Sequence, residues 1–323
     1  MLSVNNKKDL NKRYLIYGSR ISTEYLYKYQ DLILKCKDGE KIYKLETKNI
    51  KPLFKLVKMG FIERKGNVYK TTIPIILGDD YKYIRKKSKV VADFIVKKIR
   101  EDIKLLKNEL YKLGYLKYTE LILFSIIMDD LVFSIFERKD VSKHLSTLKE
   151  NRNEYNQRYI WLSNIRKSTC GTYFVFFQKG EIRYIWDLKK PIPDPFPFDE
   201  EDFISLDIFQ KKKLNQKKLD RLQKYGLITN QKVTIPLLYE DTNKKFFILC
   251  DRITKKIALS FMKKCDMKKI DKNLRINNIH KTVCIIYHEI MTDILEILER
   301  EQAIKKYRNI NPLIFLYYKR FYN

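Results

Sequence analysis

One short sequence pattern occurs twice in this chain. Residues 53–62 read L-x-x-L-x-K-x-G-F-I, and residues 219–228 read L-x-x-L-x-K-x-G-L-I. A Thr-Ile-Pro follows each copy, at residues 72–74 and 234–236. The glycines of the two copies, Gly60 and Gly226, lie 166 residues apart. That period is too long for a solenoid repeat. The duplication therefore predicts two related domains, over residues 1–150 and 151–323.

Composition sets the kind of secondary structure that these domains can build. A chain of 323 residues has room for about two domains of ordinary size. Hydrophobic residues make up 45% of the chain, which is enough for buried cores, and only 9 glycines and 8 prolines interrupt regular structure. We therefore expect a mainly α fold with small β-hairpins, in the α+β class.

The net charge of +28 indicates the class of partner. The positive charge is spread through both halves and is not confined to a tail. Such a surplus repels itself until an anion neutralises it. Lys and Arg contacts to phosphate release condensed counterions, so nucleic acid is the leading partner and a membrane surface is the rival.

Three features favour a cytoplasmic or nucleoid-associated protein. No apolar run reaches the roughly 20 residues of a membrane-spanning helix. Residues 1–13 are polar and charged, unlike a secretory signal. The five cysteines are scattered and form no C-x-x-C pair, which argues against a disulfide framework or a zinc site. We expect no membrane partner, no metal and no cofactor.

The residues around each copy predict a helix, a glycine that ends the helix, and then a hairpin. Ile50, Leu53 and Leu56 recur with helical spacing, and Gly60 stands where a helix C-cap glycine belongs. Residues 61–63 and 69–77 read as two strands joined by a turn at residues 64–67. Amphipathic patterns then predict helical extensions over residues 86–113, 119–136, 254–269 and 281–305.

This order of elements and this motif resemble the winged helix-turn-helix superfamily. The similarity covers only the helix and hairpin of each half. It implies two tandem winged-helix domains, each followed by a helical extension. Two such units in one chain look like the architecture of plasmid replication initiator proteins, although no extended motif of that family is present. The resemblance implies that the units mimic a dimer and cover successive major-groove segments about one helical turn apart.

Candidate DNA-contacting residues are polar or basic and lie off the apolar face of each proposed recognition helix, or in its wing. Such helices read base edges near their N-terminal end, and flanking bases fix the register on phosphate. In the first copy the candidates are Lys48, Asn49, Lys51, Lys55 and Lys58, with Arg64, Lys65 and Asn67 in the wing. In the second copy they are Lys213, Asn215, Gln216, Lys217, Lys218 and Arg221. A basic but merely solvated helix face is the alternative for both sets.

The second domain carries an additional hairpin and a proline-rich loop. Residues 172–177 and 181–188 read as aromatic-rich strands, joined at residues 178–180. Four prolines within residues 191–202 forbid regular helix or central strand and predict an extended loop. The sequence leaves open whether the hairpin belongs to the second unit or bridges the two.

Two other classes of function remain as alternatives. The acidic residues 199–202 suggest a metal-dependent nuclease or recombination enzyme, whereas the mixed Tyr and Lys residues at 81–87 and 317–322 suit RNA or single-stranded DNA. No P-loop, H-E-x-x-H or G-x-S-x-G sequence is present. Asp129, Asp130 and Asp293 lie in apolar helical segments, where we expect carboxylates that take part in helix packing or in salt bridges.

The leading hypothesis is a double-stranded DNA-binding protein without enzymatic activity. It would act as a transcriptional regulator or as a plasmid or viral replication initiator, with duplex DNA as its partner. The helical extensions are expected to pack the two halves together or to form a homodimer surface.

Overall fold

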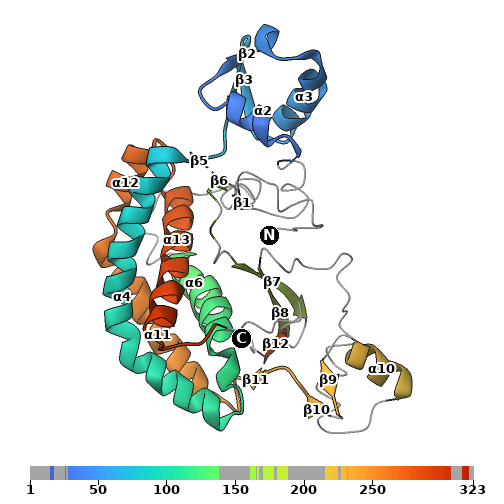
Figure 1. Cartoon of the computed structure of the whole chain (residues 1–323), viewed down its shortest axis with the longest axis vertical. Coiled ribbons are helices and arrows are strands. Elements are labelled where there is room, and N and C mark those ends of the chain that lie inside the picture. Colours follow the sequence, from blue (N-terminus) through green and yellow to red (C-terminus); the bar gives the residue numbers. More distant parts are fainter. Residues whose placement is uncertain are drawn as a thin grey trace.

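Helices form most of the structure, and short strands form four small sheets beside them (Figure 1). The computed structural model describes residues 15–17, 26, 28–137, 161–164, 166, 170–177, 180–187, 215–224, 227–230, 232–306 and 315–319. Within these ranges the sheets hold two, three, three and four strands. The expected α+β class is therefore confirmed. The proline-rich loop, the acidic residues 199–202 and the candidate Lys213 lie outside the described residues.

The first copy of the pattern lies in a small unit at one end of the molecule (Figure 1). Its elements are α2 (Gln30–Lys35), β2 (Glu40–Lys41), the 3-10 helices η2 (Ile42–Lys44) and η3 (Thr47–Asn49), α3 (Ile50–Lys58), β3 (Ile62–Lys65) and β4 (Val68–Thr71). The three strands pair antiparallel in the order β2-β4-β3. Leu53 and Leu56 anchor α3 to the unit's core and are fully buried. Burying each stabilises the unit by roughly 1.5–3 kcal/mol.

The second copy forms a smaller unit at the lower right of Figure 1. It consists of α10 (Gln216–Lys224) and a hairpin of β9 (Ile228–Thr229) and β10 (Lys232–Val233). Leu222 is fully buried, as its counterpart Leu56 is in the first unit.

Both copies share the same backbone hydrogen bonds. The amide of Phe61 donates to the carbonyl of Leu56 at 2.9 Å, and the amide of Leu227 donates to the carbonyl of Leu222 at 2.9 Å. In each copy the threonine of Thr-Ile-Pro then donates its amide to the carbonyl of that same Phe61 or Leu227, at 3.0 and 2.9 Å. Gly60 has a left-handed φ of +75°, which closes the end of α3. The repeated sequence therefore gives a repeated local structure.

The duplication extends to the strands that flank each unit. These strands are β1 (Leu15–Tyr17), β5 (Ile75–Ile76) and β6 (Trp161–Ser163) in one sheet, and β7 (Cys170–Phe177), β8 (Gly180–Asp187), β11 (Leu237–Tyr239) and β12 (Phe315–Lys319) in another. β6 is antiparallel to β1 and parallel to β5. In the same way, β12 is antiparallel to β8 and parallel to β11. The two sheets share one strand order, with β7 added at one edge.

The strand register follows the same period as the glycines. Ile16 pairs with Leu162, and Ile182 pairs with Tyr317. Ile16 and Ile182 are 166 residues apart, like Gly60 and Gly226. The hairpin of β7 and β8 therefore belongs to the sheet of the second half. β6 lies beyond the expected boundary at residue 150, yet it completes the sheet of the first half.

Long helices connect the parallel strands of each half, because a parallel pair needs an extended crossover. In the first half they are α4 (Gly78–Lys112), η4 (Leu116–Tyr118), α5 (Thr119–Ile122), the π-helix η5 (Leu123–Leu131) and α6 (Val132–Glu137). In the second half they are α11 (Lys244–Lys264), α12 (Met267–Leu274) and α13 (Ile279–Arg300). The helix expected over residues 254–269 is thus wrong in its bounds. The observed helix α11 starts earlier, at Lys244, and ends at Lys264. A separate helix, α12, follows, and the side chain of Asp266 caps it by accepting a hydrogen bond from the amide of Lys269.

The two sets of helices pack across the halves. α4 packs along α11 and against α13, whereas α11 packs against η5 and α6. Each half thus buries its longest helix largely on the other half, within one shared core. The expectation that the extensions pack the halves together is confirmed.

A buried ion cluster reinforces this cross-packing. Arg166, just after β6, contacts Glu289 at 2.8 Å and Asp293 at 2.9 Å on α13. Arg85 of α4 contacts the same two carboxylates at 3.2 and 2.7 Å, and the Ser88 hydroxyl donates to Asp293. Burial favours the neutral acid and raises the pKa of Glu289, although the two arginines act in the opposite direction.

Candidate nucleic-acid interface

The outward face of α3 is basic, as the sequence analysis expected. Lys51, Lys55 and Lys58 are exposed, while Pro52 stands in the buried first turn. Phe54 lies among these lysines and is half exposed, with its ring edge-on to Tyr69 at 6.4 Å between centroids. This aromatic contact was missed as a candidate, because apolar periodicity does not distinguish a half-exposed residue beside the core from one within it.

Lys48 and Asn49 lie just before α3 in η3. Lys48 is exposed and pairs with Glu46 at 2.6 Å. That contact lowers the pKa of Glu46 and raises the pKa of Lys48. Asn49 occupies the N-cap position of α3, is half-buried and makes no capping bond with its side chain. Both residues therefore lie at the N-terminal end of the basic helix.

The turn between β3 and β4 presents the remaining candidates of the first unit. Arg64 donates from Nε to the carbonyl of Gly66 at 2.8 Å, and its guanidinium lies 5.7 Å from the ring centre of Tyr69. Gly66 has a φ of +61°, which the turn requires. Lys65 and Asn67 are exposed at the same tip. The hairpin therefore carries a positive tip held by local contacts.

The second unit places its candidates on and before α10. Asn215 accepts from the amide of Lys218 at 3.0 Å and so caps the helix. Gln216 donates to Asp220 at 2.6 Å. Lys217 and Arg221 are exposed and Lys218 is half-buried. Asn215 and Gln216 thus have local structural roles, which residue type alone did not reveal.

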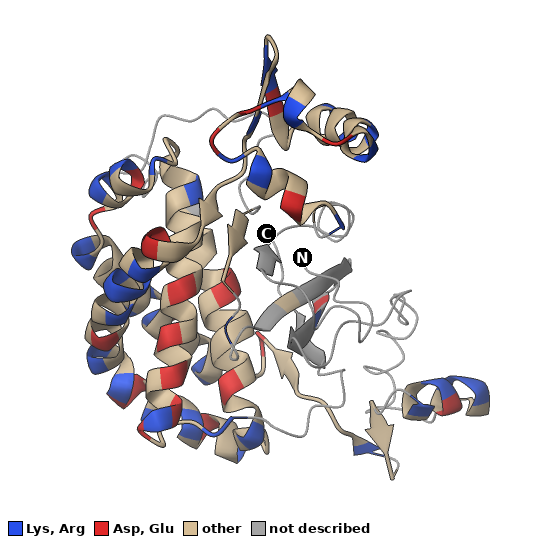
Figure 2. Ribbon diagram, turned by 45° about the horizontal axis from the view of Figure 1, so that its top comes forward, with Lys and Arg blue, Asp and Glu red and all other residues tan. Residues whose placement is uncertain are grey.

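The candidates form two separate groups. Figure 1 shows α3 and α10 at opposite ends of the molecule, with the flanking sheets between them and the long helices to one side. Figure 2 shows Lys and Arg on both helices. The arrangement is therefore suited to an extended polyanion and not to a small ligand held between the two helices.

Asp130 and Asp293 in the apolar helices form salt bridges. Asp130 pairs with Arg183 of β8 at 2.6 Å, and Asp293 pairs with Arg85 and Arg166. The expectation of salt bridges is confirmed for both residues. Desolvation raises the pKa of the neighbouring Asp129 to about 6. Throughout the described ranges, no group of three or more His, Cys, Asp or Glu residues is placed to hold a metal ion.

His288 is packed among aromatic side chains of the core. Its ring packs against Phe133 and Trp161 at 5.3 and 5.0 Å between ring centroids, and its Nδ1 lies 2.7 Å from the carbonyl of Cys284. Burial lowers the pKa of His288 to about 4. The imidazole is therefore neutral at physiological pH and fixed within the core.

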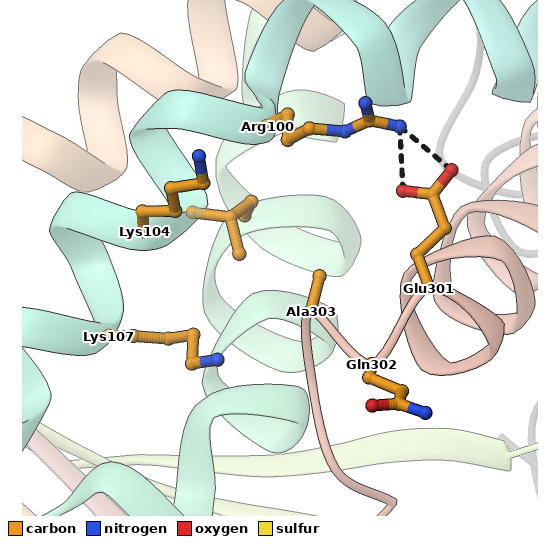
Figure 3. Close-up of a pocket in the computed structure, with 7 residues that line it drawn as sticks. Arg100, Lys104, Lys107, Glu301, Gln302 and Ala303 are labelled. Carbon is orange, nitrogen blue, oxygen red and sulfur yellow. Dashed lines mark hydrogen bonds and ion pairs between the residues drawn. The ribbon is translucent and has the colours of Figure 1, made fainter.

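A shallow pocket of about 630 Å³ lies between α4 and the chain that follows α13 (Figure 3). Arg100 and Glu301 face each other across it through two hydrogen bonds of 2.8 Å. Lys104 and Lys107 line the same side. The pocket offers a neutralised arginine and two lysines, without a nucleophile beside a base, so it provides no catalytic arrangement.

A comparison with known protein families, curated proteins and solved structures finds no match for this chain. In the portion of the chain that the structure describes, no helix has both the length and the apolar composition that a bilayer crossing needs.

Proposed function

We propose that this chain is a double-stranded DNA-binding protein with two tandem winged-helix units, acting as a transcriptional regulator or a replication initiator. The observation that carries the proposal is the first unit. There a basic helix precedes an antiparallel hairpin, and the hairpin is completed by an earlier strand in the order β2-β4-β3. That arrangement fits a winged helix with α3 as its recognition helix and the turn at Gly66 as its wing.

Charge and exposure support duplex DNA as the partner. Lys51, Lys55 and Lys58 point away from the core of the unit, and Arg64 and Lys65 extend the positive surface along the wing. Lysines at this spacing suit phosphates on both sides of a groove. The net charge of +28 adds long-range attraction to any nucleic acid.

The shared body sets the geometry of binding. Because α4, α11 and α13 pack across the halves, the helical bodies that follow the two units share one core. Both units would therefore engage only half-sites that lie at one spacing and on one face of the duplex. An insertion of about 5 base pairs turns one half-site by half a helical turn and should uncouple the units.

The test begins with selection of a preferred site from random duplexes, followed by fluorescence anisotropy over a salt series. Duplex DNA should bind more tightly than single-stranded DNA or RNA of the same sequence. The variants K51A/K55A/K58A and K217A/K218A/R221A should each weaken duplex binding. Each lost phosphate contact should also flatten the salt slope by about 0.9.

The matched control is K104A/K107A/K112A, which removes three charges from α4 and none from α3 or α10. It should leave the salt slope nearly unchanged. If all three variants bind duplex DNA alike, or if single strands bind as tightly as duplexes, the proposal is wrong. Footprinting then separates the two roles, because iterated sites at an origin indicate initiation and a site over a promoter indicates regulation.

A further inference from the structure

A second basic surface lies away from both units, on the outer side of the helical layer. Figure 2 shows Lys and Arg along that edge. Phe94 of α4 meets Lys264 near the end of α11, whereas Asp102, further along α4, pairs with Arg252 and Lys256, nearer the start of α11. The two helices therefore run in opposite directions, so equivalent positions of the duplication come together where they cross.

Two lysines meet at this crossing, and each has an exposed lysine beside it in the sequence. Lys98 and Lys264 lie 5.8 and 4.6 Å from the ring centre of Phe94, and each follows another exposed lysine, Lys97 and Lys263. Within the described residues, none of these four lysines makes an ion pair with a carboxylate. In the described part of the chain, the carboxylates nearest in α4 are the exposed Asp93 and Glu101, of which Glu101 pairs with Lys104, so the four lysines leave the crossing positive.

The basic residues nearer the start of α11 are neutralised by carboxylates. Lys256 and Arg252 contact Asp102 at 2.6 and 2.8 Å, and Lys255 contacts Asp251 at 2.6 Å. Ion pairs therefore neutralise the basic residues around Asp102 and Asp251. The lysines around Phe94 have no such ion pairs within the described residues.

Large apolar side chains are also exposed on α4 and α11. Val90 and Leu259 are each 63% exposed, and Ile248 is 66% exposed. Leu105 is also exposed, beyond the crossing on α4. The stretch from Val90 to Leu105 rises about 22 Å along the helix, which is the length of a partner helix of about 15 residues. We call the surface formed by Val90, Phe94, Lys97, Lys98, Leu105, Ile248, Leu259, Lys263 and Lys264 the crossing face.

We propose that the crossing face docks an acidic amphipathic helix of a partner protein. Carboxylates on such a helix would neutralise the lysines, and its apolar stripe would cover Val90 and Leu259. Phosphate groups supply only the first of these interactions, because they leave the apolar side chains in water. Charge complementarity together with exposed apolar area is the pattern of a helix-in-groove contact.

The test uses a labelled synthetic peptide of 16 residues with leucines at helical spacing and glutamates on its flanks. A scrambled peptide of the same composition is its control. In fluorescence anisotropy, the ordered peptide should bind at least about tenfold more tightly than the scrambled one, since only the ordered peptide presents a continuous apolar stripe. The variant V90S/L259S should remove that advantage.

The lysine contribution is tested with K97Q/K98Q/K263Q/K264Q, which should weaken the ordered peptide about tenfold or more. Its matched control is K51Q/K55Q/K58Q/K70Q, which removes the same charge from the first unit and should leave peptide binding unchanged. All altered side chains are exposed, so thermal unfolding midpoints should stay at the wild-type value.

Three outcomes would overturn the proposal. Equal binding of ordered and scrambled peptides means that charge alone acts. A loss of duplex DNA affinity in the crossing-face lysine variant, as large as the loss in the control, assigns the face to nucleic acid. Tight binding to vesicles of anionic lipid, without peptide binding, assigns it to a membrane surface.

Discussion

The buried ion cluster gives the sharpest test of how the two halves are held together. Arg166 is only 8% exposed and contacts Glu289 and Asp293, and it also contacts Glu296 at 2.7 Å. Replacing it with methionine keeps an unbranched apolar stem and removes the charged guanidinium. Glu289 and Asp293 then share only Arg85 as a cationic partner within the described residues.

Breaking a buried ion pair by removing one partner costs about 3–5 kcal/mol, because a charge is left buried without compensation. We expect R166M to lower the free energy of unfolding by about that amount at pH 7–8. An exposed pair serves as the control. Lys82 and Asp79 lie 2.9 Å apart with both side chains almost fully exposed, so K82M should cost at most about 1 kcal/mol.

The loss of unfolding free energy in R166M, relative to the wild type, should depend on pH. Burial already raises the pKa of Glu289, and Arg166 is the strongest charge that opposes this shift. A carboxyl group whose pKa is higher in the folded chain than in the unfolded chain takes up a proton on folding. Its unfavourable contribution is therefore full above the folded pKa and fades as the pH falls through it. The gap between R166M and wild type should narrow as the pH falls from 8 towards 5.

The assay is urea-induced unfolding followed by circular dichroism at pH 8, 7, 6 and 5. E289Q combined with R166M should recover part of the loss, since the orphaned charge is then absent. A deficit for R166M that equals that of K82M and does not change with pH would refute the reasoning. It would mean that the cluster is hydrated and does not carry the cross-packing.

Two further predictions concern buried groups. H288F should reduce the loss of stability on acidification. The pKa of His288 is about 4 in the folded chain, against an ordinary value of 6.5, so the unfolded chain takes up the proton first. The stability of the wild type therefore falls as the pH drops from about 6.5 to 4, and the variant lacks this contribution. Unfolding midpoints at pH 7 and 5 check this, and an unchanged pH dependence contradicts it. The thiols of Cys36 and Cys265 should react with iodoacetamide far more slowly in the folded than in the urea-unfolded protein, since burial raises their pKa to about 11 and about 12 and also blocks access. Peptide mapping by mass spectrometry measures each site, and rapid labelling of either thiol under native conditions contradicts the burial.

Short-range features were predictable from the sequence by itself. The period of Leu53 and Leu56 fixed a helix, Gly60 fixed its end, and the repeat of that pattern around Gly226 gave the same backbone hydrogen bonds in both copies. These signals reside within about one or two helical turns, where side-chain period and backbone conformation are set locally. The salt bridges of Asp130 and Asp293 were also predictable, because a carboxylate within an apolar helix needs a cationic partner.

The partners of distant segments were decided only by the tertiary structure. The sequence did not indicate that β6 completes the first sheet, that β8 belongs to the second, or that α4 crosses to α11 and α13. Nor did it indicate that Lys98 of α4 and Lys264 of α11 both lie over the ring of Phe94. Such contacts join residues more than 80 positions apart in the sequence, and the apolar faces involved have no local mark of which other face will bury them. The choice is made by the shared core, in which the apolar faces of both sets of helices are buried together.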